Sequence, residues 1–260
     1  MKKLFVILLC GLIAFIFIET NAQENKNFKT TDKSIIYFGD SITEGGTNNG
    51  ISWTNYINDI LKFKKSVNAS KGGATFSQEN LENMIVTQVL EHKDEKYDYI
   101  LLQGGINDAK IPVALGEFTD SYQLQDFDLS TYTGMLDATF YYLTKYYKGS
   151  SIGVMIMYPT PYADEYGWTG KTGEPEEYFD ALIQICEKWG IPYINFYDKD
   201  LATVITKNEL LDGVHLTDQG YQKISPYLAN FIQTLQPYNR DIHKEEKVRS
   251  SGLKYYNEKF

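Results

Sequence analysis

Three residues of the chain carry side chains that could together perform nucleophilic acyl chemistry. Ser41 follows the apolar run 35–38, a glycine and an aspartate, while Asp212 and His215 lie three residues apart far downstream. A serine nucleophile needs a base to remove its proton, and a histidine base needs an acceptor that orients its ring. Taken singly, Ser41 could be a helix cap and His215 an ordinary residue beside a helix. In the order Ser…Asp…His they predict a hydrolytic triad.

Two further segments could donate hydrogen bonds to the negative oxygen that forms when an ester is attacked. Gly72-Gly73 follows the second apolar run, and Asn107 follows the third. A glycine offers an unobstructed backbone N–H, and an asparagine offers a side-chain amide, which are the usual donors of an oxyanion hole. Each could equally be a plain turn residue.

The elements that must position these residues alternate along the chain. Apolar runs predict strands at 35–38, 67–69, 97–102, 151–157 and 191–196. Amphipathic or capped stretches predict helices at about 53–61, 78–91, 129–147, 175–189 and 218–235. Short strands separated by helices indicate a parallel sheet in three layers. Since the carboxyl ends of parallel strands share one edge, the loops with Ser41, Gly73 and Asn107 are expected to meet there.

These blocks resemble those of a known superfamily. Gly39-Asp40-Ser41-Ile42, the Gly72-Gly73 loop, Gly105-Ile106-Asn107-Asp108 and Asp212-Gly213-Val214-His215 look like the four sequence blocks of the SGNH hydrolases, also called GDSL esterases and lipases. The resemblance spans residues 35–235, and the one departure is isoleucine in place of the leucine of the GDSL name. It implies a three-layer α/β/α sandwich with a five-stranded parallel sheet, of the flavodoxin-like kind.

The resemblance also implies a role for each residue. Ser41 would attack the acyl carbonyl, His215 would carry the proton, and Asp212 would orient His215. The oxyanion hole would consist of the backbone N–H groups of Ser41 and Gly73 and the side-chain amide of Asn107. Gly73 is preferred to Gly72 because its spacing fits the family better.

Composition and the N-terminal residues predict the domain organisation and the localisation of the protein. The 260 residues suit one α/β domain, and the net charge of −9 argues against nucleic acid as a partner. Residues 1–22 look like a secretory signal, with two lysines before a short apolar stretch. We therefore expect a secreted or periplasmic single domain over 23–260, with its core at about 34–236 and a tail at 237–260. An uncleaved membrane anchor is the alternative, and no stable membrane insertion of the mature chain is expected.

Several other chemistries find little support in the sequence. Gly149-Ser150-Ser151-Ile152-Gly153 matches the G-x-S-x-G motif of α/β-hydrolases, but a predicted helix precedes it and a strand follows, the reverse of the required context. The three histidines are far apart and show no metal-binding spacing, so neither a metal nor a cofactor is expected. Cys186 lies on an apolar helical face and is expected to be buried and inert.

The substrate is predicted from the expected rim of the site. Polar residues 47–49 follow the nucleophile, and the loop 158–174 carries aromatic residues that suit a sugar ring, among them Tyr158, Tyr162 and Trp168. We expect hydrolysis of a small acyl ester, acetyl above all, on a carbohydrate. The alternatives are a lipase, lysophospholipase or thioesterase of the same family, an acyltransferase, or a non-catalytic glycan-binding protein.

Overall fold

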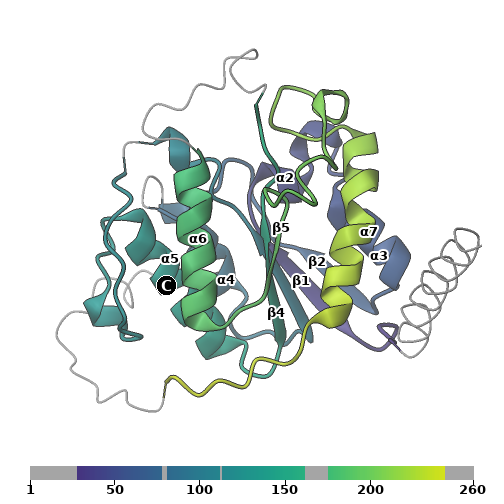
Figure 1. Ribbon diagram of the computed structural model, residues 1–260. Helices are drawn as coiled ribbons and strands as arrows, with labels where there is room; N and C mark the ends of the chain where they lie inside the picture. The colour runs from purple at the N-terminus through teal and green to yellow at the C-terminus, as the bar shows by residue number, and fades with distance from the viewer. Residues whose placement is uncertain (1–27, 78–80, 112, 162–174, 244–260) are drawn as a thin grey trace, which may run out of the picture.

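A sheet of five parallel strands forms the centre of the molecule. The computed structural model describes residues 28–77, 81–111, 113–161 and 175–243. The strand order is β2-β1-β3-β4-β5, which is the flavodoxin-like order, so the predicted α/β fold is confirmed (Figure 1). The strands are β1 (Ser34–Phe38), β2 (Lys65–Asn68), β3 (Tyr99–Gln103), β4 (Ser151–Ile156) and β5 (Tyr193–Asn195).

The three central strands are buried on both faces, which explains their continuous apolar runs. In β1, Ile36 is fully buried and aligns with Val67 of β2 and Ile100 of β3. All six residues of β4 are buried. The edge strand β2 is largely exposed, and its sequence is accordingly more polar. The buried central strands therefore support the turn that leads from β1 to Ser41.

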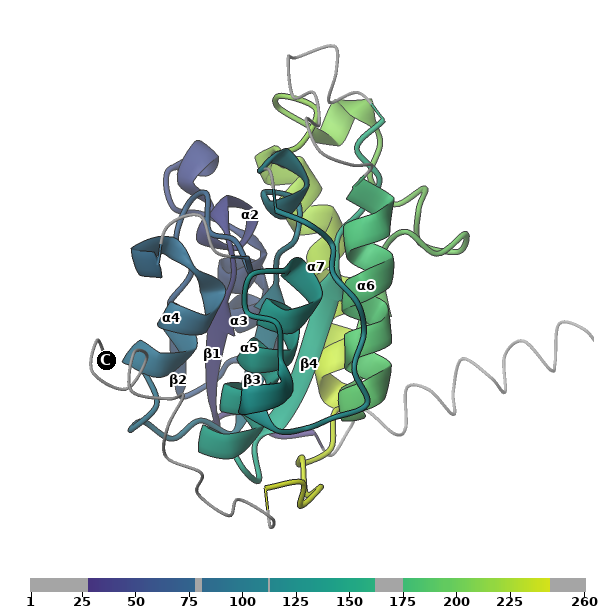
Figure 2. The ribbon, with the colours of Figure 1, turned by 90° about the vertical axis from the view of Figure 1, so that its left-hand side faces the viewer.

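Helices cover both faces of this sheet (Figures 1 and 2). On one face, α3 (Trp53–Leu61) packs against α7 (Asp218–Thr234). On the other, α5 (Tyr132–Tyr146) lies between α4 (Ile85–Glu91) and α6 (Pro175–Trp189). Among the described residues, no helix has the length and apolar character needed to cross a membrane.

Two helices begin later than their sequence patterns predict. The α4 helix starts at Ile85 because Thr75 forms a β-bridge with Met84, and the Ile85 N–H donates to the Thr75 carbonyl. The α5 helix starts at Tyr132 because the side chain of Thr131 accepts a hydrogen bond from the N–H of Gly134 and caps the first turn. The start of α4 is thus set by a contact with another segment, and the start of α5 by the capping residue directly before it.

Residues 235–243, which follow α7, form a strap across the edge of the sheet at which β4 begins (Figure 1). The N–H of Tyr238 donates to the Ser150 carbonyl, and its hydroxyl donates to the Trp189 carbonyl at the end of α6. His243 reaches Thr144 on α5, with 3.1 Å between Nε2 and Oγ1. The first part of the predicted tail thus packs on the domain as far as residue 243. Cys186 is buried and has a free thiol, as predicted.

Candidate active site

Ser41 is the first residue of the short helix α2 (Ser41–Glu44), which begins directly after β1. Gly39 makes this turn possible, because a Cβ atom there would lie 2.8 Å from the backbone oxygen of Gln103 at the end of β3. The side chain of Asp40 caps the helix by accepting a hydrogen bond from the N–H of Ile42. The sequence Gly-Asp-Ser therefore brings the Ser41 side chain to the carboxyl edge of the sheet.

Two buried glutamines hold this turn, and sequence reasoning assigned neither of them a role. The Gln88 side chain bonds both the N–H and the carbonyl of Gly39, each at 2.9 Å. Gln103 donates to the Asp40 carboxylate at 3.1 Å and accepts from the Thr43 hydroxyl at 2.7 Å. Burial raises the pKa of Asp40 to about 6, although the hydrogen bonds from the Ile42 N–H and the Gln103 amide act in the opposite direction. The one sign of Gln88 and Gln103 in the sequence is that each is a polar residue within an otherwise apolar helix or strand.

The side chains of Ser41, His215 and Asp212 form a hydrogen-bonded chain. The Ser41 Oγ lies 2.8 Å from Nε2 of His215, and Nδ1 of the same ring lies 2.7 Å from Oδ2 of Asp212. An ionised carboxylate only accepts, so Nδ1 carries the proton and Nε2 can accept from the serine hydroxyl. His215 as a whole is 5% exposed, so its side chain is held among protein atoms. This arrangement can remove the hydroxyl proton as the oxygen attacks a carbonyl.

The loop between Asp212 and His215 is shaped by the aspartate itself. Oδ1 of Asp212 accepts from the backbone N–H of Val214 at 3.2 Å and from that of His215 at 2.8 Å. Burial raises the pKa of Asp212, but the hydrogen bonds from His215 and Val214 and the nearby imidazole together outweigh it, and the pKa lies below its usual value. The carboxylate is thus ionised under ordinary conditions, as an orienting group requires.

Tyr158 was predicted to bind substrate at the rim, and this prediction is wrong. Its side chain is fully buried, and its hydroxyl donates to the Val214 carbonyl at 2.6 Å. Tyr158 follows β4, whose burial continues to the end of the strand, so the ring joins the core and supports the loop that carries His215. The other two predicted rim residues, Tyr162 and Trp168, lie outside the described residues.

Besides the N–H of Ser41, the candidate oxyanion donors lie on the loops after β2 and β3. Gly73 adopts a left-handed backbone with φ of 72°, and a Cβ on the preceding Gly72 would lie 3.9 Å from Cβ of Ser41. The Asn107 amide donates one hydrogen bond to the Ala74 carbonyl at 3.0 Å, and an amide has a second N–H to offer. In the part of the chain that the structure describes, the N–H groups of Ser41 and Gly73 have no protein acceptor. The preference for Gly73 over Gly72 stays a prediction.

Asp108 joins the two donor loops. Its buried carboxylate accepts from the N–H groups of Phe76 at 3.1 Å and Ser77 at 2.7 Å, and also from the Ser77 hydroxyl. All of these hydrogen bonds come from the loop that carries Gly73. Burial raises its pKa to about 6. Asp108 thus ties the loop after β2 to the loop after β3.

Positive charge and polar groups complete this edge of the sheet. Lys110 follows Asn107 by three residues; burial lowers its pKa to about 8, and the negative charges of Asp40 and Asp212 act in the opposite direction. Beside α2, Asn48 donates to Asp218 of α7 at 3.3 Å. Among the described residues, no cluster of three or more His, Cys, Asp or Glu side chains could hold a metal ion.

Comparisons with known proteins agree with this architecture. The sequence model of the GDSL-like lipase/acylhydrolase family matches residues 37–223. Among solved structures, a protein from Lactobacillus plantarum is similar with 19% identity and a TM-score of 0.65, covering 77% of this chain and 96% of that one. A lipase/acylhydrolase from Enterococcus faecalis has 18% identity and a TM-score of 0.53, covering 80% and 100% of the two chains. Est24, a carbohydrate acetylesterase from Sinorhizobium meliloti, has 16% identity and a TM-score of 0.53, covering 77% and 98%. A search of curated proteins found no match.

Proposed function

The chain belongs to the GDSL-like lipase/acylhydrolase family, and on this basis we propose that it is a secreted serine esterase that removes a small acyl group from a carbohydrate. The observation that carries the proposal is the chain of hydrogen bonds from Ser41 through His215 to Asp212. These three side chains supply a nucleophile, a base and a carboxylate that orients the base, each within hydrogen-bond distance of the next. Acyl transfer by a serine requires this set of groups.

In the proposed mechanism, Ser41 Oγ attacks the ester carbonyl while Nε2 of His215 takes the hydroxyl proton. The imidazolium, stabilised by the Asp212 carboxylate, then gives this proton to the leaving alcohol, and the acyl group stays on Ser41. A water molecule attacks the acyl-enzyme, His215 again takes and returns a proton, and the carboxylic acid leaves with the serine hydroxyl restored. Each proton thus passes through Nε2, and no cofactor is needed.

The negatively charged oxygen that forms at each attack on the carbonyl must be stabilised by hydrogen-bond donors. We assign this role to the N–H groups of Ser41 and Gly73 and to the free N–H of the Asn107 amide. Support comes from the two backbone groups, which have no acceptor in the described part of the chain, and from the fixed orientation of the Asn107 amide. Donors that are already oriented stabilise charge without the cost of reorganisation.

The carbohydrate part of the proposal rests on the polar character of the described rim. Thr47 and Asn49 are exposed beside α2, and Asn48 is partly exposed, so the described rim on this side offers hydroxyl and amide groups. A lipase acting on long acyl chains would need a broad apolar lip. Est24 is a carbohydrate acetylesterase on the same fold, but at 16% identity the likeness concerns the fold alone. Lipase, thioesterase and acyltransferase activities are the competing functions.

Secretion is proposed from the first 22 residues. Lys2 and Lys3 precede an apolar stretch that ends at a small-residue site, the pattern of a cleaved signal. Amino-terminal sequencing of the protein recovered from the native host would give Gln23 as the first residue. A first residue upstream of the apolar stretch would favour the uncleaved anchor instead.

The test of the function is the release of p-nitrophenol from acetyl, butyryl and octanoyl esters by wild type and Ser41→Ala. We expect acetyl ester to be cleaved fastest and Ser41→Ala to be inactive. Faster cleavage of octanoyl ester would indicate a lipase, and activity surviving in Ser41→Ala would refute the assignment of the nucleophile. Acetylated xylo-oligosaccharides then test whether the alcohol part of the ester is a carbohydrate. Analysis of the products formed with an added sugar acceptor separates acyl transfer from hydrolysis.

A further inference from the structure

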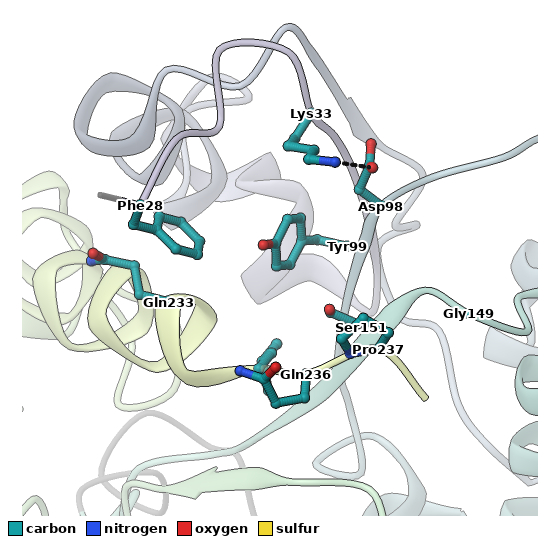
Figure 3. A pocket seen from close by; sticks show the side chains of 10 residues that line it. Phe28, Lys33, Asp98, Tyr99, Gly149, Ser151, Gln233, Gln236 and Pro237 are labelled. Carbon is teal, nitrogen blue, oxygen red and sulfur yellow. Dashed lines mark hydrogen bonds and ion pairs between the residues drawn. The ribbon is translucent and has the colours of Figure 1, made fainter. Parts of the chain in front are cut away.

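A cavity of about 320 Å³ lies at the edge of the sheet opposite to Ser41 (Figure 3). It is formed where β1, β3 and β4 begin and where α7 ends. The lining side chains that matter here are Phe28, Lys33, Asp98, Tyr99, Ser151 and Gln236. The five residues of β1 separate the two edges, so the cavity is roughly 15 Å from the nucleophile. Its volume is at the lower end of the range of small-molecule sites, about 300–1,000 Å³.

Two hydroxyl groups in this cavity have no partner among the described residues of the protein. Ser151 is only 4% exposed, and its oxygen and that of Tyr99 face the cavity in Figure 3. Within the described ranges neither hydroxyl has a hydrogen-bond partner, and neither is among the polar atoms sealed off from solvent. Buried polar groups in proteins are nearly always hydrogen-bonded. These two hydroxyls are therefore available to a molecule that enters the cavity.

The charges in the cavity compensate each other. Lys33 Nζ lies 3.2 Å from Oδ1 of Asp98, and Oδ2 of Asp98 accepts from the N–H and the hydroxyl of Ser34. An anion would meet the Asp98 carboxylate, and a cation would meet the Lys33 ammonium, so neither charge is favoured. The amide of Gln236, on the exposed rim, adds a neutral donor and acceptor. The polar groups therefore suit a neutral ligand with several hydroxyls.

Aromatic rings supply the apolar surface. Phe28 and Tyr99 pack edge to face with 6.0 Å between their ring centres, and both line the cavity. Aromatic carbon next to hydroxyl and amide groups matches a molecule that has C–H groups on one side and hydroxyls around its rim. A pyranose ring has this distribution. A fatty acyl chain would leave the hydroxyls of Tyr99 and Ser151 without partners.

We propose that this cavity binds one ring of a neutral saccharide and is a second, non-catalytic carbohydrate site. Tyr99 and Ser151 hydroxyls and the Gln236 amide bond the sugar hydroxyls, while the rings of Phe28 and Tyr99 contact its C–H groups. The site lies at the far edge of the sheet from Ser41, so an attached glycan chain is held independently of the reaction. Its existence does not depend on the esterase activity proposed above.

The test is titration calorimetry of the full chain with D-xylose, D-glucose and their β-1,4-linked tetrasaccharides, none of which carries an ester. Three variants are compared with wild type: Tyr99→Phe removes one hydroxyl, Gln236→Ala removes an exposed amide with little effect on folding, and Tyr146→Phe is a matched control at an exposed tyrosine outside both sites. We expect saturable binding, weakened about 5- to 10-fold in Tyr99→Phe and Gln236→Ala and unchanged in Tyr146→Phe. Hydrolysis of p-nitrophenyl acetate is expected to be equal in all four proteins.

Several results would overturn the proposal. One is that none of the four sugars binds wild type saturably. Another is that affinity is the same in Tyr99→Phe and Gln236→Ala as in wild type, which would place any sugar binding elsewhere, the Ser41 edge included. Tighter binding of D-glucuronic acid than of D-glucose would contradict the neutral character of the site. Loss of esterase activity in Ser41→Ala bears on the proposed function alone and leaves these binding results unaffected.

Discussion

Replacing Asp212 by asparagine should abolish most activity while leaving the loop around it intact. Oδ1 of Asp212 accepts from two backbone N–H groups, and the asparagine side-chain oxygen can do the same. The other carboxylate oxygen, 2.7 Å from Nδ1 of His215, is replaced by an NH₂ group, which donates instead of accepting. The ring must then carry its proton on Nε2, where it faces the Ser41 hydroxyl and cannot accept from it.

The expected size of the effect follows from this loss of the base. A serine hydrolase whose histidine is held in the wrong tautomer retains about 10⁻⁴ of its kcat. Asp212→Ala, by contrast, also removes the acceptor of the Val214 and His215 N–H groups and should unfold at a lower temperature than Asp212→Asn. Comparing the two variants separates the electrostatic role of the carboxylate from its role in shaping the loop.

The assay is kcat for p-nitrophenyl acetate together with thermal unfolding of wild type, Asp212→Asn and Asp212→Ala. Hydrogen bonds hold the pKa of Asp212 below its usual value, so its carboxylate stabilises the fold above the unfolded pKa, and this contribution is lost as pH falls through the folded pKa. The difference in Tm between wild type and Asp212→Asn should therefore be larger at pH 7 than at pH 3. An Asp212→Asn enzyme with more than a tenth of wild-type kcat would refute the tautomer argument.

Three other substitutions test the surrounding structure. Asn107→Ala should lower kcat about 10²–10³-fold, because one oxyanion donor is lost; unchanged kcat would remove Asn107 from the oxyanion hole. Tyr158→Phe leaves the Val214 carbonyl without its donor, which costs about 1–3 kcal/mol and lowers Tm by about 2–12 °C; an unchanged Tm in calorimetry would contradict the support role. Gly39→Ala places a Cβ atom 2.8 Å from a backbone oxygen, so cooperative unfolding in circular dichroism should shift to much lower temperature or vanish; a wild-type melting curve would show that the turn can relax.

The fold was predictable because its signals are local. Strands β1, β3 and β4 are buried on both faces, so their sequences are short apolar runs, and the helices between them have one apolar face or a clear end. Parallel strands must place their carboxyl ends on one edge, which brings the loops of Ser41, Gly73 and Asn107 together without any knowledge of distances. Helix starts were less predictable because α4 is limited by the pairing of Thr75 with Met84.

Residue type and spacing predicted that Ser41, Asp212 and His215 act together, because a hydroxyl, a carboxylate and an imidazole in this order are typical of a hydrolytic triad. Only the tertiary structure decided which polar groups support them. Gln88 and Gln103 meet the turn at Gly39 and Asp40 from other elements of the fold, and Asp108 bonds a loop some 30 residues away in the chain. Tyr158 belongs to an aromatic-rich segment that was expected to line the rim, but it lies in the core, because burial depends on packing between layers. Such long-range contacts leave no periodic trace in a single sequence.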